Sequence, residues 1–470
     1  MHAKIIATIG PAARDPVVLD RLIDVGLAVV RLNMAHGDHR AVAADIKAVR
    51  AAAGRRRRPV AVLADLQGPK IRTGPLENKR LQLMPGDCLV LTTESAPGTA
   101  EKISVSYPDL PKDVAPGQSI LVADGLIELE VVKVNNHEVT CVVLTGGTLL
   151  EHQGINLPQA AISTPTITDK DRVDLGFCLD QGVDVVALSF VRSGRDIIEL
   201  KGLINAVGKR CPVIAKIEKR EALASIDEII EAADGVMIAR GDLGVELPAE
   251  DVPILQKEII AKAQRAGKAS IIATQMLDSM IHSPRPTRAE ASDVANAVFD
   301  GADAVMLSGE TAIGKYPVEA VETMVKIIER AEGVVDYESL LQARRHWSAE
   351  TVSGAVSFAA CQLASILPAA AIVTSTETGR TAKEVSRYRP QAPIVAVSPN
   401  AETVRQLMLW WGVRPITTAQ SDNIDDMLHT ALAETERAGL AKSGDKVVVT
   451  AGTLVNVPGT TNLIKVETIA

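Results

Sequence analysis

Two strand-like segments decide the fold: Pro212-Val-Ile-Ala-Lys-Ile-Glu218 and Gly235-Val-Met-Ile-Ala-Arg-Gly-Asp242. Each is an apolar, β-rich run that ends in charged residues, and a helix-length segment at 221–233 separates them. Because side chains alternate along a strand, Lys216 and Glu218 leave it on the same face. A lysine and a carboxylate at the end of a buried strand are costly unless they pair, bind a metal or take part in chemistry. We interpret them as metal-binding and catalytic groups.

The same alternation of strand and helix continues on both sides of this stretch. Near-continuous apolar strands between amphipathic helices indicate a parallel sheet, and eight such units predict a closed (β/α)8 barrel, an α/β fold. The expected strands are residues 4–9, 29–34, 60–66, 183–190, 212–218, 235–242, 270–276 and 304–310. Active sites of such barrels lie at the carboxyl ends of the strands, which are unusually polar in this sequence. These polar residues are Arg31, Asn33, Asp65, Ser189, Lys216, Glu218, Asp242, Thr274, Gln275, Ser308 and Glu310.

Two further regions depart from this alternation. Residues 80–150 contain short β-rich runs separated by Pro-Gly, Asp-Gly, Asn-Asn and Gly-Gly turns, which predicts a small β-barrel domain inserted into the larger barrel. Hinge-like segments at 68–75 and 162–165 flank it, so we expect it to close as a lid over the polar rim. After residue 346 strands and helices alternate again and predict a separate α/β domain. The predicted division is 1–68 with 165–335 for the barrel, 69–164 for the lid and 336–470 for the C-terminal domain.

Composition narrows the class of protein. The chain has 470 residues, of which 47% are apolar, and its sequence has no apolar run long enough to cross a bilayer. The sequence begins almost directly with a strand and without a signal-peptide pattern, so we expect a cytoplasmic protein that binds no membrane. A net charge of -8 argues against a nucleic-acid-binding surface. The five cysteines lack CxxC spacing, so neither a disulfide framework nor a zinc site is expected.

Seven motifs, in this order along the chain, resemble those of the pyruvate kinase family. They are Arg31-Leu-Asn-Met-Ala-His-Gly37, Asp65-Leu-Gln-Gly-Pro-Lys-Ile-Arg-Thr-Gly74, Ala215-Lys-Ile-Glu218, Ala239-Arg-Gly-Asp-Leu-Gly244, Thr274-Gln-Met-Leu277, Pro286-Thr-Arg-Ala-Glu290 and Met306-Leu-Ser-Gly-Glu-Thr-Ala312. The resemblance covers the whole chain and implies a barrel, an inserted lid, a C-terminal domain and usually a homotetramer. It also implies the reaction in which phosphoenolpyruvate and ADP give pyruvate and ATP.

The resemblance and the chemistry of phosphoryl transfer together imply roles for the rim residues. Glu218 and Asp242 offer hard oxygen ligands for Mg2+ or Mn2+. Lys216 is expected to contact the transferring phosphoryl group and to stabilise the enolate, and Thr274 to line the face where the enolate is protonated. The implied substrate-binding residues are Arg31, Ser189, Lys216, Ala239, Arg240, Gly241, Asp242 and Thr274, and the catalytic ones among them are Arg31, Lys216 and Thr274. The implied nucleotide-binding residues are Asn33, His36, Arg72 and Asp124.

The sequence departs from the commonest family pattern where many relatives bind K+. Ala35 replaces a Ser and Leu66 replaces a Thr, so two oxygen ligands are lost, while Lys70 replaces a Glu and brings an ammonium group. A site short of oxygens binds K+ poorly, whereas a lysine delivers a tethered positive charge. We therefore hypothesise that Lys70 is a monovalent-cation surrogate and that K+ is not required. Gln153 also stands where many relatives have Lys, which puts one phosphate contact from the lid in doubt.

The C-terminal region contains a candidate effector site. The segment Thr376-Glu-Thr-Gly-Arg-Thr381 lies between an expected strand and an expected helix, where hydroxyls and amides suit a phosphate group. N-capping by threonine is the alternative explanation. The resemblance favours a phosphorylated sugar or nucleotide, with Gly459-Thr-Thr-Asn462 as a second wall. The assigned residues are Thr376, Thr378, Gly379, Arg380 and Thr381.

Two other functions compete with this interpretation. One is a metal-independent Schiff-base aldolase or lyase, in which a neutral Lys216 attacks a carbonyl group. Trapping by borohydride and indifference to EDTA would favour it, but Glu218 and Asp242 argue for a metal. The other is a ligand-binding relative without activity, which the intact Lys, Glu, Asp and Thr set disfavours.

Overall fold

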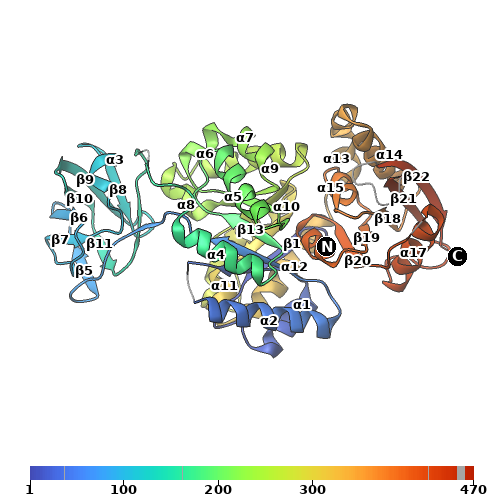
Figure 1. Ribbon diagram of the computed structural model, residues 1–470, viewed down its shortest axis with the longest axis horizontal. Coiled ribbons are helices and arrows are strands. Elements are labelled where there is room, and N and C mark those ends of the chain that lie inside the picture. The colour runs from blue at the N-terminus through green and yellow to red at the C-terminus, as the bar shows by residue number, and fades with distance from the viewer. Residues whose placement is uncertain (36–37, 161, 422, 453–460, 470) are drawn as a thin grey trace.

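Three parts follow one another along the longest axis of the computed structural model (Figure 1). The barrel occupies the middle, the inserted β domain lies at one end, and the C-terminal α/β domain lies at the other. The structure describes residues 1–35, 38–160, 162–421, 423–452 and 461–469. Within these ranges, no helix combines the length and the apolar character needed to cross a membrane.

The barrel closes in the strand order β1-β17-β16-β15-β14-β13-β3-β2, with all neighbouring strands parallel. All eight predicted strands are confirmed. Their bounds are β1 (Lys4–Thr8), β2 (Leu27–Asn33), β3 (Ala61–Leu66), β13 (Val185–Leu188), β14 (Val213–Ile217), β15 (Gly235–Ala239), β16 (Ala269–Ala273) and β17 (Ala304–Leu307). These strands are buried on both faces, as expected for strands enclosed by helices.

Several predicted strands were too long at their carboxyl ends, and in two of them a helix begins within the predicted strand. The segment from Arg240 to Asp242 starts a short helix, α8 (Arg240–Glu246), and the end of the last predicted strand belongs to α11 (Gly309–Ala312). Gly241 and Gly309 lie at these turns, and glycine favours a change of chain direction over a continued strand. The helix expected at 221–233 is likewise two helices, α6 (Arg220–Ala224) and α7 (Ile226–Ala232), separated at Ser225.

Amphipathic helices surround the strands. α1 (Pro16–Val25) begins after an Asp15 cap and has a proline in its first turn, and it buries Leu19, Leu22 and Ile23. In α10 (Arg288–Phe299), Thr287 and Glu290 form a reciprocal capping box, so the Pro286-Thr-Arg-Ala-Glu290 motif has a structural role. The other long helices around the barrel are α2 (His39–Arg56), α4 (Asp169–Asp180), α5 (Gly194–Ala206), α9 (Val252–Arg265) and α12 (Pro317–Glu332).

The inserted domain is a curved sheet in the order β4-β12-β8-β9-β10-β6-β7. A β-bridge between Thr73 and Val105 joins its two edges. Buried apolar side chains, among them Leu91, Leu129 and Val139, fill the enclosed core. A two-stranded ribbon of β5 and β11 is attached to it. The bounds are β4 (Ile71–Arg72), β5 (Arg80–Leu83), β6 (Cys88–Thr92), β7 (Lys102–Ser104), α3 (Leu110–Asp113), β8 (Ser119–Val122), β9 (Ile127–Val134), β10 (Glu138–Thr145), β11 (Gly147–Leu150) and β12 (Gly154–Asn156).

The C-terminal domain has a five-stranded sheet in the order β20-β19-β18-β21-β22, in which β22 is antiparallel. The predicted α/β domain is confirmed, but the strand β20 was missed because it contains Pro415. Proline is tolerated there because β20 is an edge strand. The elements are α14 (Val352–Ile366), β18 (Ala371–Ser375), α15 (Arg380–Ser386), β19 (Ile394–Ser398), α16 (Ala401–Gln406), β20 (Val413–Thr417), α17 (Ile424–Arg437), β21 (Lys446–Gly452) and β22 (Thr461–Thr468).

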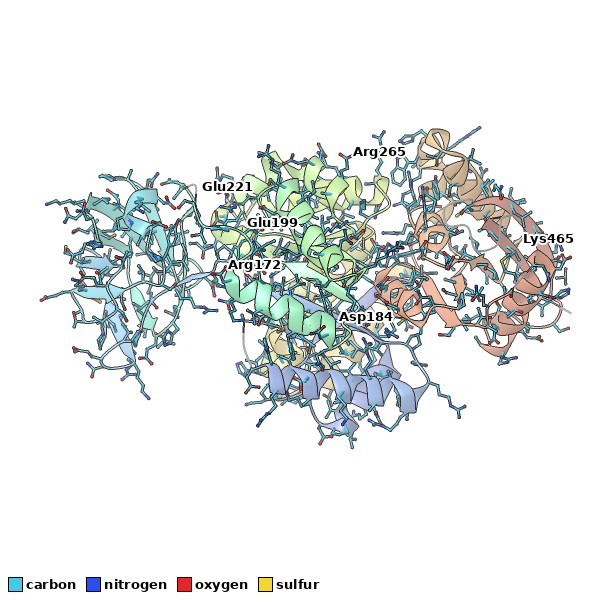
Figure 2. All side chains as sticks on the ribbon, viewed as in Figure 1. Arg172, Asp184, Glu199, Glu221, Arg265 and Lys465 are labelled. Carbon is cyan, nitrogen blue, oxygen red and sulfur yellow. The ribbon has the colours of Figure 1, made fainter. Side chains whose placement is uncertain are left out.

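Buried ion pairs fasten the C-terminal domain to the barrel. Asp184, labelled between these two parts in Figure 2, accepts from Arg50 of the barrel at 2.7 Å and from Arg405 of the C-terminal domain at 2.6 Å. Asp303, at the start of β17, binds Arg389 at 2.7 Å. Both carboxylates lie away from the carboxyl ends of the strands, so they hold the two parts together without occupying the rim.

Candidate active site

Lys216 is the centre of a cluster of charges at the carboxyl end of the barrel strands. Its Nζ lies 2.8 Å from Glu218 Oε1 and 3.3 Å from Asp65 Oδ1, and it donates to Ser189 Oγ at 2.8 Å. The predicted common face of Lys216 and Glu218 is therefore confirmed. Lys216 and Glu218 also form an ion pair, so the two groups are paired as well as positioned.

The charges in this cluster shift one another's pKa values, and they favour the charged forms of Lys216 and Asp65. Burial lowers the pKa of Lys216, but Asp65 and Glu218 outweigh burial and raise that pKa above its usual value. Burial raises the pKa of Asp65, but Lys216 and Arg31 outweigh it and leave that pKa below its usual value. Burial raises the pKa of Glu218, and Asp242 adds to this effect while Lys216 opposes it. Lys216 is consequently a permanent cation in this site.

Arg31 connects the cluster to the neighbouring strands. Its Nε donates to Asp65 Oδ2 at 2.7 Å, and its Nη1 donates to Thr8 Oγ1 at 3.1 Å. Asn33 is the register partner of Asp65 on the adjacent strand, and its Oδ1 accepts from the backbone amide of Ala35 at 3.1 Å. The planar guanidinium of Arg31 is thus anchored on one side, as a group that clamps a phosphate should be.

A tight turn and a strained threonine form the opposite wall. Thr274 has φ +70°, a left-handed conformation that is unfavourable for a β-branched residue. Its Oγ1 accepts from the amide of Gly241 at 2.7 Å, and Arg240 Nη2 donates to its carbonyl oxygen at 3.0 Å. Arg240 is itself anchored by Asp293 at 2.6 Å. Residues 239–242 and Thr274 are therefore brought together. The Gly241 amide is already hydrogen-bonded to the Thr274 hydroxyl in this arrangement.

Two carboxylates of the rim are suited to a metal ion. Glu218 Oε2 accepts from the amide of Phe190 at 2.8 Å, which fixes the direction of its other oxygen, and the Asp242 side chain is 27% exposed. Within the described residues, no group of three or more His, Cys, Asp or Glu side chains is arranged to hold a metal. A pair of hard oxygen donors fits Mg2+ or Mn2+ that also binds substrate oxygens, because Mg2+ usually takes one or two carboxylates and completes its shell with phosphates and water.

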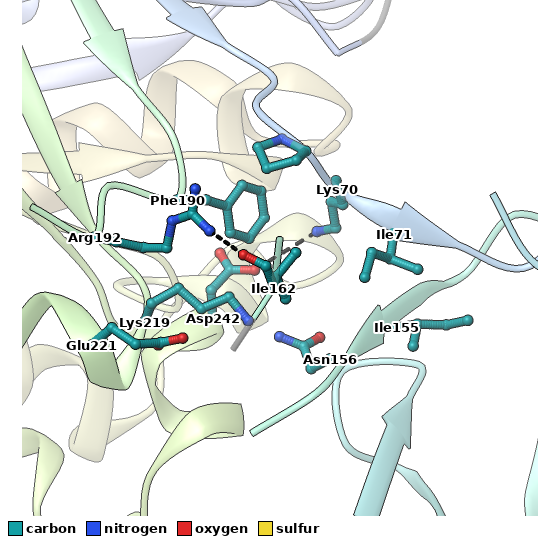
Figure 3. A pocket seen from close by; sticks show the side chains of 11 residues that line it. Lys70, Ile71, Ile155, Asn156, Ile162, Phe190, Arg192, Lys219, Glu221 and Asp242 are labelled. Carbon is teal, nitrogen blue, oxygen red and sulfur yellow. Dashed lines mark hydrogen bonds and ion pairs between the residues drawn. The ribbon is translucent and has the colours of Figure 1, made fainter. Parts of the chain in front are cut away.

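The lid approaches the barrel next to this pair. Figure 3 shows Lys70 facing Asp242, and Lys70 Nζ lies 3.7 Å from Asp242 Oδ1. Lys70 belongs to the first hinge, and Gly154 of the lid lies so close that a side chain there would meet Lys70 Cε at 3.2 Å. The second hinge is held by Arg192, which donates to the Ile162 carbonyl oxygen. A pocket between lid and barrel is lined by Pro69, Lys70, Ile71, Ile155, Asn156, Ile162, Phe190, Arg192, Lys219, Glu221 and Asp242.

Several residues assigned to the nucleotide lie in the lid or outside the described residues. Arg72 Nη1 donates to the His152 carbonyl oxygen at 2.9 Å, so its described hydrogen bond is made within the lid. Asp124 lies in a turn with φ +54°, close to Gly154. Gln153 Oε1 accepts from the Leu150 amide at 3.0 Å, so its side chain completes a lid turn. His36 lies outside the described residues.

The sequence interpretation overlooked three polar residues at the lid contact. Lys219 Nζ lies 2.5 Å from Glu246 Oε1, and Asn156 Nδ2 donates to the same oxygen at 3.2 Å. The sequence did contain a signal for Lys219, because this second lysine directly follows the proposed metal ligand Glu218. Glu246 follows Asp242 by four residues, which is the spacing of one helix face, but only with α8 recognised does that spacing acquire a meaning.

The candidate effector segment forms a compact turn before α15. Thr376 Oγ1 accepts from the Gly379 amide at 2.9 Å, and Gly379 has φ +82°, which favours glycine. The hydroxyls of Thr381 and Thr461 lie 2.8 Å apart, so the two expected walls meet. Residues 459 and 460 of the second wall lie outside the described residues. The turn is thus closed by its own hydrogen bond, but Thr376 does not cap α15, whose N-cap residue is Gly379 without a side-chain cap.

Comparison with known proteins extends over the full chain. Two family models match, the pyruvate kinase barrel domain over residues 1–321 and the pyruvate kinase alpha/beta domain over residues 354–467. Pyruvate kinase 2 of Synechocystis is 50% identical over 472 residues, which cover 100% of this chain and 79% of that protein. Pyruvate kinase of Geobacillus stearothermophilus is 49% identical over 470 residues, covering 99% and 80%. A solved pyruvate kinase structure from Cryptosporidium parvum matches with a TM-score of 0.93 and 39% identity, covering 100% and 96%.

Proposed function

The chain belongs to the pyruvate kinase family, and from this premise we propose a pyruvate kinase that works without K+, with the Lys70 ammonium as its built-in monovalent cation. An enzyme of this type transfers the phosphoryl group of phosphoenolpyruvate to ADP and gives pyruvate and ATP, a step of glycolysis. The observation that carries the proposal is the position of Lys70, whose Nζ lies 3.7 Å from Asp242.

The loss of oxygen ligands supports the same proposal. Ala35 and Leu66 provide no side-chain oxygen where K+ ligands are expected, and Asp65 is already bonded to Arg31 and Lys216. K+ needs several oxygen ligands, whereas an ammonium on a flexible stem brings its charge without them. Lys70 reaches the rim on the side of Asp242, so we propose that it acts through its charge there.

The rim residues have distinct proposed roles in the reaction. Lys216 touches the phosphoryl group as it moves and stabilises the enolate oxygen left behind, because its charge is fixed by Asp65 and Glu218. Arg31 holds the phosphate in a forked contact. Ser189 and the turn at 239–242 line the substrate, and Thr274 faces the carbon where the enolate takes its proton. The proposed nucleotide side is formed by Asn33, His36, Arg72 and Asp124.

Glu218 and Asp242 are the proposed ligands of the divalent ion, since enzymes of this family depend on Mg2+. When bound, Mg2+ would neutralise negative charge on substrate oxygens. Phe190 orients Glu218 through its backbone amide, and Lys70 lies beside Asp242, so both carboxylates have fixed surroundings.

The lyase alternative loses support at Lys216. Attack on a carbonyl requires a neutral amine, but the two carboxylates raise the pKa of Lys216 above its usual value. Borohydride with a carbonyl substrate should therefore leave Lys216 unmodified.

Further assignments rest on the family premise. We propose the domain division 1–68 with 165–335, 69–164 and 336–470, a homotetramer, a location in the cytoplasm, and a phosphorylated effector at Thr376, Thr378, Gly379, Arg380 and Thr381. Binding of a candidate sugar phosphate or nucleotide, measured by calorimetry on the full chain and on Thr381→Ala, tests the effector assignment.

The test of the main proposal is the rate of pyruvate formation from phosphoenolpyruvate and ADP with Mg2+, in buffer free of K+, NH4+ and Na+. Full activity that added K+ barely changes supports both parts of the proposal. Activity that appears only with K+ keeps the reaction and overturns the role of Lys70. No activity in either condition overturns both.

A further inference from the structure

The lid is fastened to the barrel at a buried carboxylate to which the proposed chemistry assigns no role. Glu246 ends α8, four residues after Asp242, and its side chain is 1% exposed. One oxygen, Oε1, lies 2.5 Å from Lys219 Nζ and accepts from Asn156 Nδ2 at 3.2 Å. Lys219 directly follows Glu218, and Asn156 ends the lid strand β12. A single oxygen thus links the lid to both segments that present the proposed metal ligands.

The surrounding contacts place the lid against α8 as a whole. A side chain at Gly125, in a lid turn, would lie 3.7 Å from Val245, the neighbour of Glu246. Figure 3 shows the Asn156 and Lys219 side chains pointing toward one another across the pocket. The lid therefore meets α8 through its turn and through β12, and the contact on Glu246 is the polar one.

The chemistry of the contact makes it dependent on lid position. Glu246 and Lys219 both belong to the barrel, so their buried ion pair persists wherever the lid is. Asn156 belongs to the lid, so its hydrogen bond exists only while the lid is close. Hydrogen bonds to a charged acceptor are stronger than neutral ones, and this one is buried.

We propose that Glu246 is a positioning residue that docks the lid, through Asn156, above Asp242 and Glu218. Its fixed partner Lys219 holds the carboxylate in place beside Asn156 of the lid. The proposal deepens the function proposed above and rests on closure of the lid over that site. It gives a role to Glu246 without contact to substrate.

The distance between lid and barrel tests this proposal directly. Cys88 on β6 is exposed and the other four cysteines are buried, so it accepts a spin label selectively. Val173 on α4 is 63% exposed, and Val173→Cys provides a second label on the barrel. Pulsed electron double resonance on this doubly labelled chain, diluted with unlabelled chain, reports the lid position with and without Mg2+ and phosphoenolpyruvate.

The decisive variant is Asn156→Asp, which places a second carboxylate against Glu246. We expect the ratio of closed to open lid to fall by about tenfold or more, seen as a longer and broader distance distribution. Asn136→Asp is the matched control, because Asn136 is an exposed residue of the same domain. The double variant Asn156→Asp/Glu246→Gln exchanges donor and acceptor and should restore the short distance.

Each outcome decides the proposal. A longer distance in Asn156→Asp, no change in Asn136→Asp and recovery in the double variant support docking on Glu246. An unchanged distance in Asn156→Asp, an equal change in the control, or a double variant as open as Asn156→Asp overturns it. Kinetics provide a second readout, because weaker docking should raise KM for the substrates more than it lowers kcat. Failure of the proposed reaction would instead abolish turnover in the unsubstituted chain while leaving the distances intact.

Discussion

The two ends of the barrel both bury a lysine, yet their surroundings favour opposite charge states. At the carboxyl end of β14, two carboxylates raise the pKa of Lys216 above its usual value, so the ammonium persists. At the amino end of β1, burial lowers the pKa of Lys4 to about 7, and Arg414 adds to this shift. Lys4 Nζ donates to the Val413 carbonyl oxygen at 2.5 Å, a neutral acceptor in the C-terminal domain.

The difference shows what each end of the barrel is built to do. Burial disfavours an ammonium in both places, and only close carboxylates outweigh it. The rim keeps a charge that a polyanionic substrate can use, as phosphoryl transfer requires. The amino end of the barrel, here called the base, tolerates loss of the Lys4 charge because Lys4 packs between the barrel and the C-terminal domain. His2 follows the same rule, since burial lowers its pKa to about 3.

The largest predicted effect is on turnover, and it is seen when the lysine at each end of the barrel is replaced in turn by methionine. Lys216→Met should lower turnover by about 100- to 1,000-fold or more, because it removes a preorganised charge from the site of phosphoryl transfer. Lys4→Met should leave turnover close to that of the unsubstituted chain. Steady-state rates at saturating substrate measure both, with circular dichroism to confirm folding. Equal losses of turnover would show that the two ends do not differ as described.

The second prediction compares a substitution that should lower stability with one that should abolish activity. Asp303 accepts from Ser270, Trp411 and Arg389 at the base, so Asp303→Ala leaves the buried Arg389 charge unpaired. We expect a loss of about 3–5 kcal/mol of folding free energy. Asp242→Ala at the rim should abolish Mg2+-dependent turnover with little change in stability, because Asp242 is partly exposed.

Urea unfolding followed by tryptophan fluorescence measures the two stabilities, and pyruvate formation measures the two activities. The backbone N–H of Trp411 donates to Asp303 Oδ1 at 3.1 Å where the barrel meets the C-terminal domain, which makes the fluorescence sensitive to that interface. An Asp303→Ala protein as stable as the unsubstituted chain would contradict the prediction.

A smaller effect should appear in the dependence of stability on pH. As the pH rises from 7 toward about 10.4, Lys4 becomes neutral in the folded state while it remains largely protonated in the unfolded state. The unfolded state then binds more protons, so this group makes stability rise with pH, by at most about 1.4 kcal/mol per pH unit. The melting temperature of the unsubstituted chain, measured relative to that of Lys4→Met, should therefore increase from pH 7 to pH 9. A difference that stays constant over this range would mean that Lys4 remains charged when folded.

The sequence was most informative where chemistry and periodicity agree. The eight barrel strands are regular apolar runs, and Lys216 and Glu218 stand at the spacing that puts them on one strand face. Residues whose role depends on tertiary contact were beyond such reasoning. β20 was hidden by Pro415, which marks an edge that only the assembled sheet reveals. Glu246 acquires a meaning only when Asn156, 90 residues away in the chain, is placed against it.

Lys70 lies between these two cases. Its replacement of a Glu in a motif was visible in the sequence, but the direction of its side chain was not. The structure places Lys70 beside Asp242, whereas Asp65 is bonded to Arg31 and Lys216. A positive charge at the rim is thus supplied by the chain itself, in keeping with the contrast between the rim and the base.

The most direct test of the account is the rate of pyruvate formation by Lys70→Glu, measured beside the unsubstituted chain as K+ is raised from zero. We predict that the variant loses at least about tenfold in rate without K+, the effect expected for removing one charged contact, and recovers part of it as K+ is added. The unsubstituted chain should respond little. A variant that keeps full activity in the absence of K+ would contradict the proposed role of Lys70.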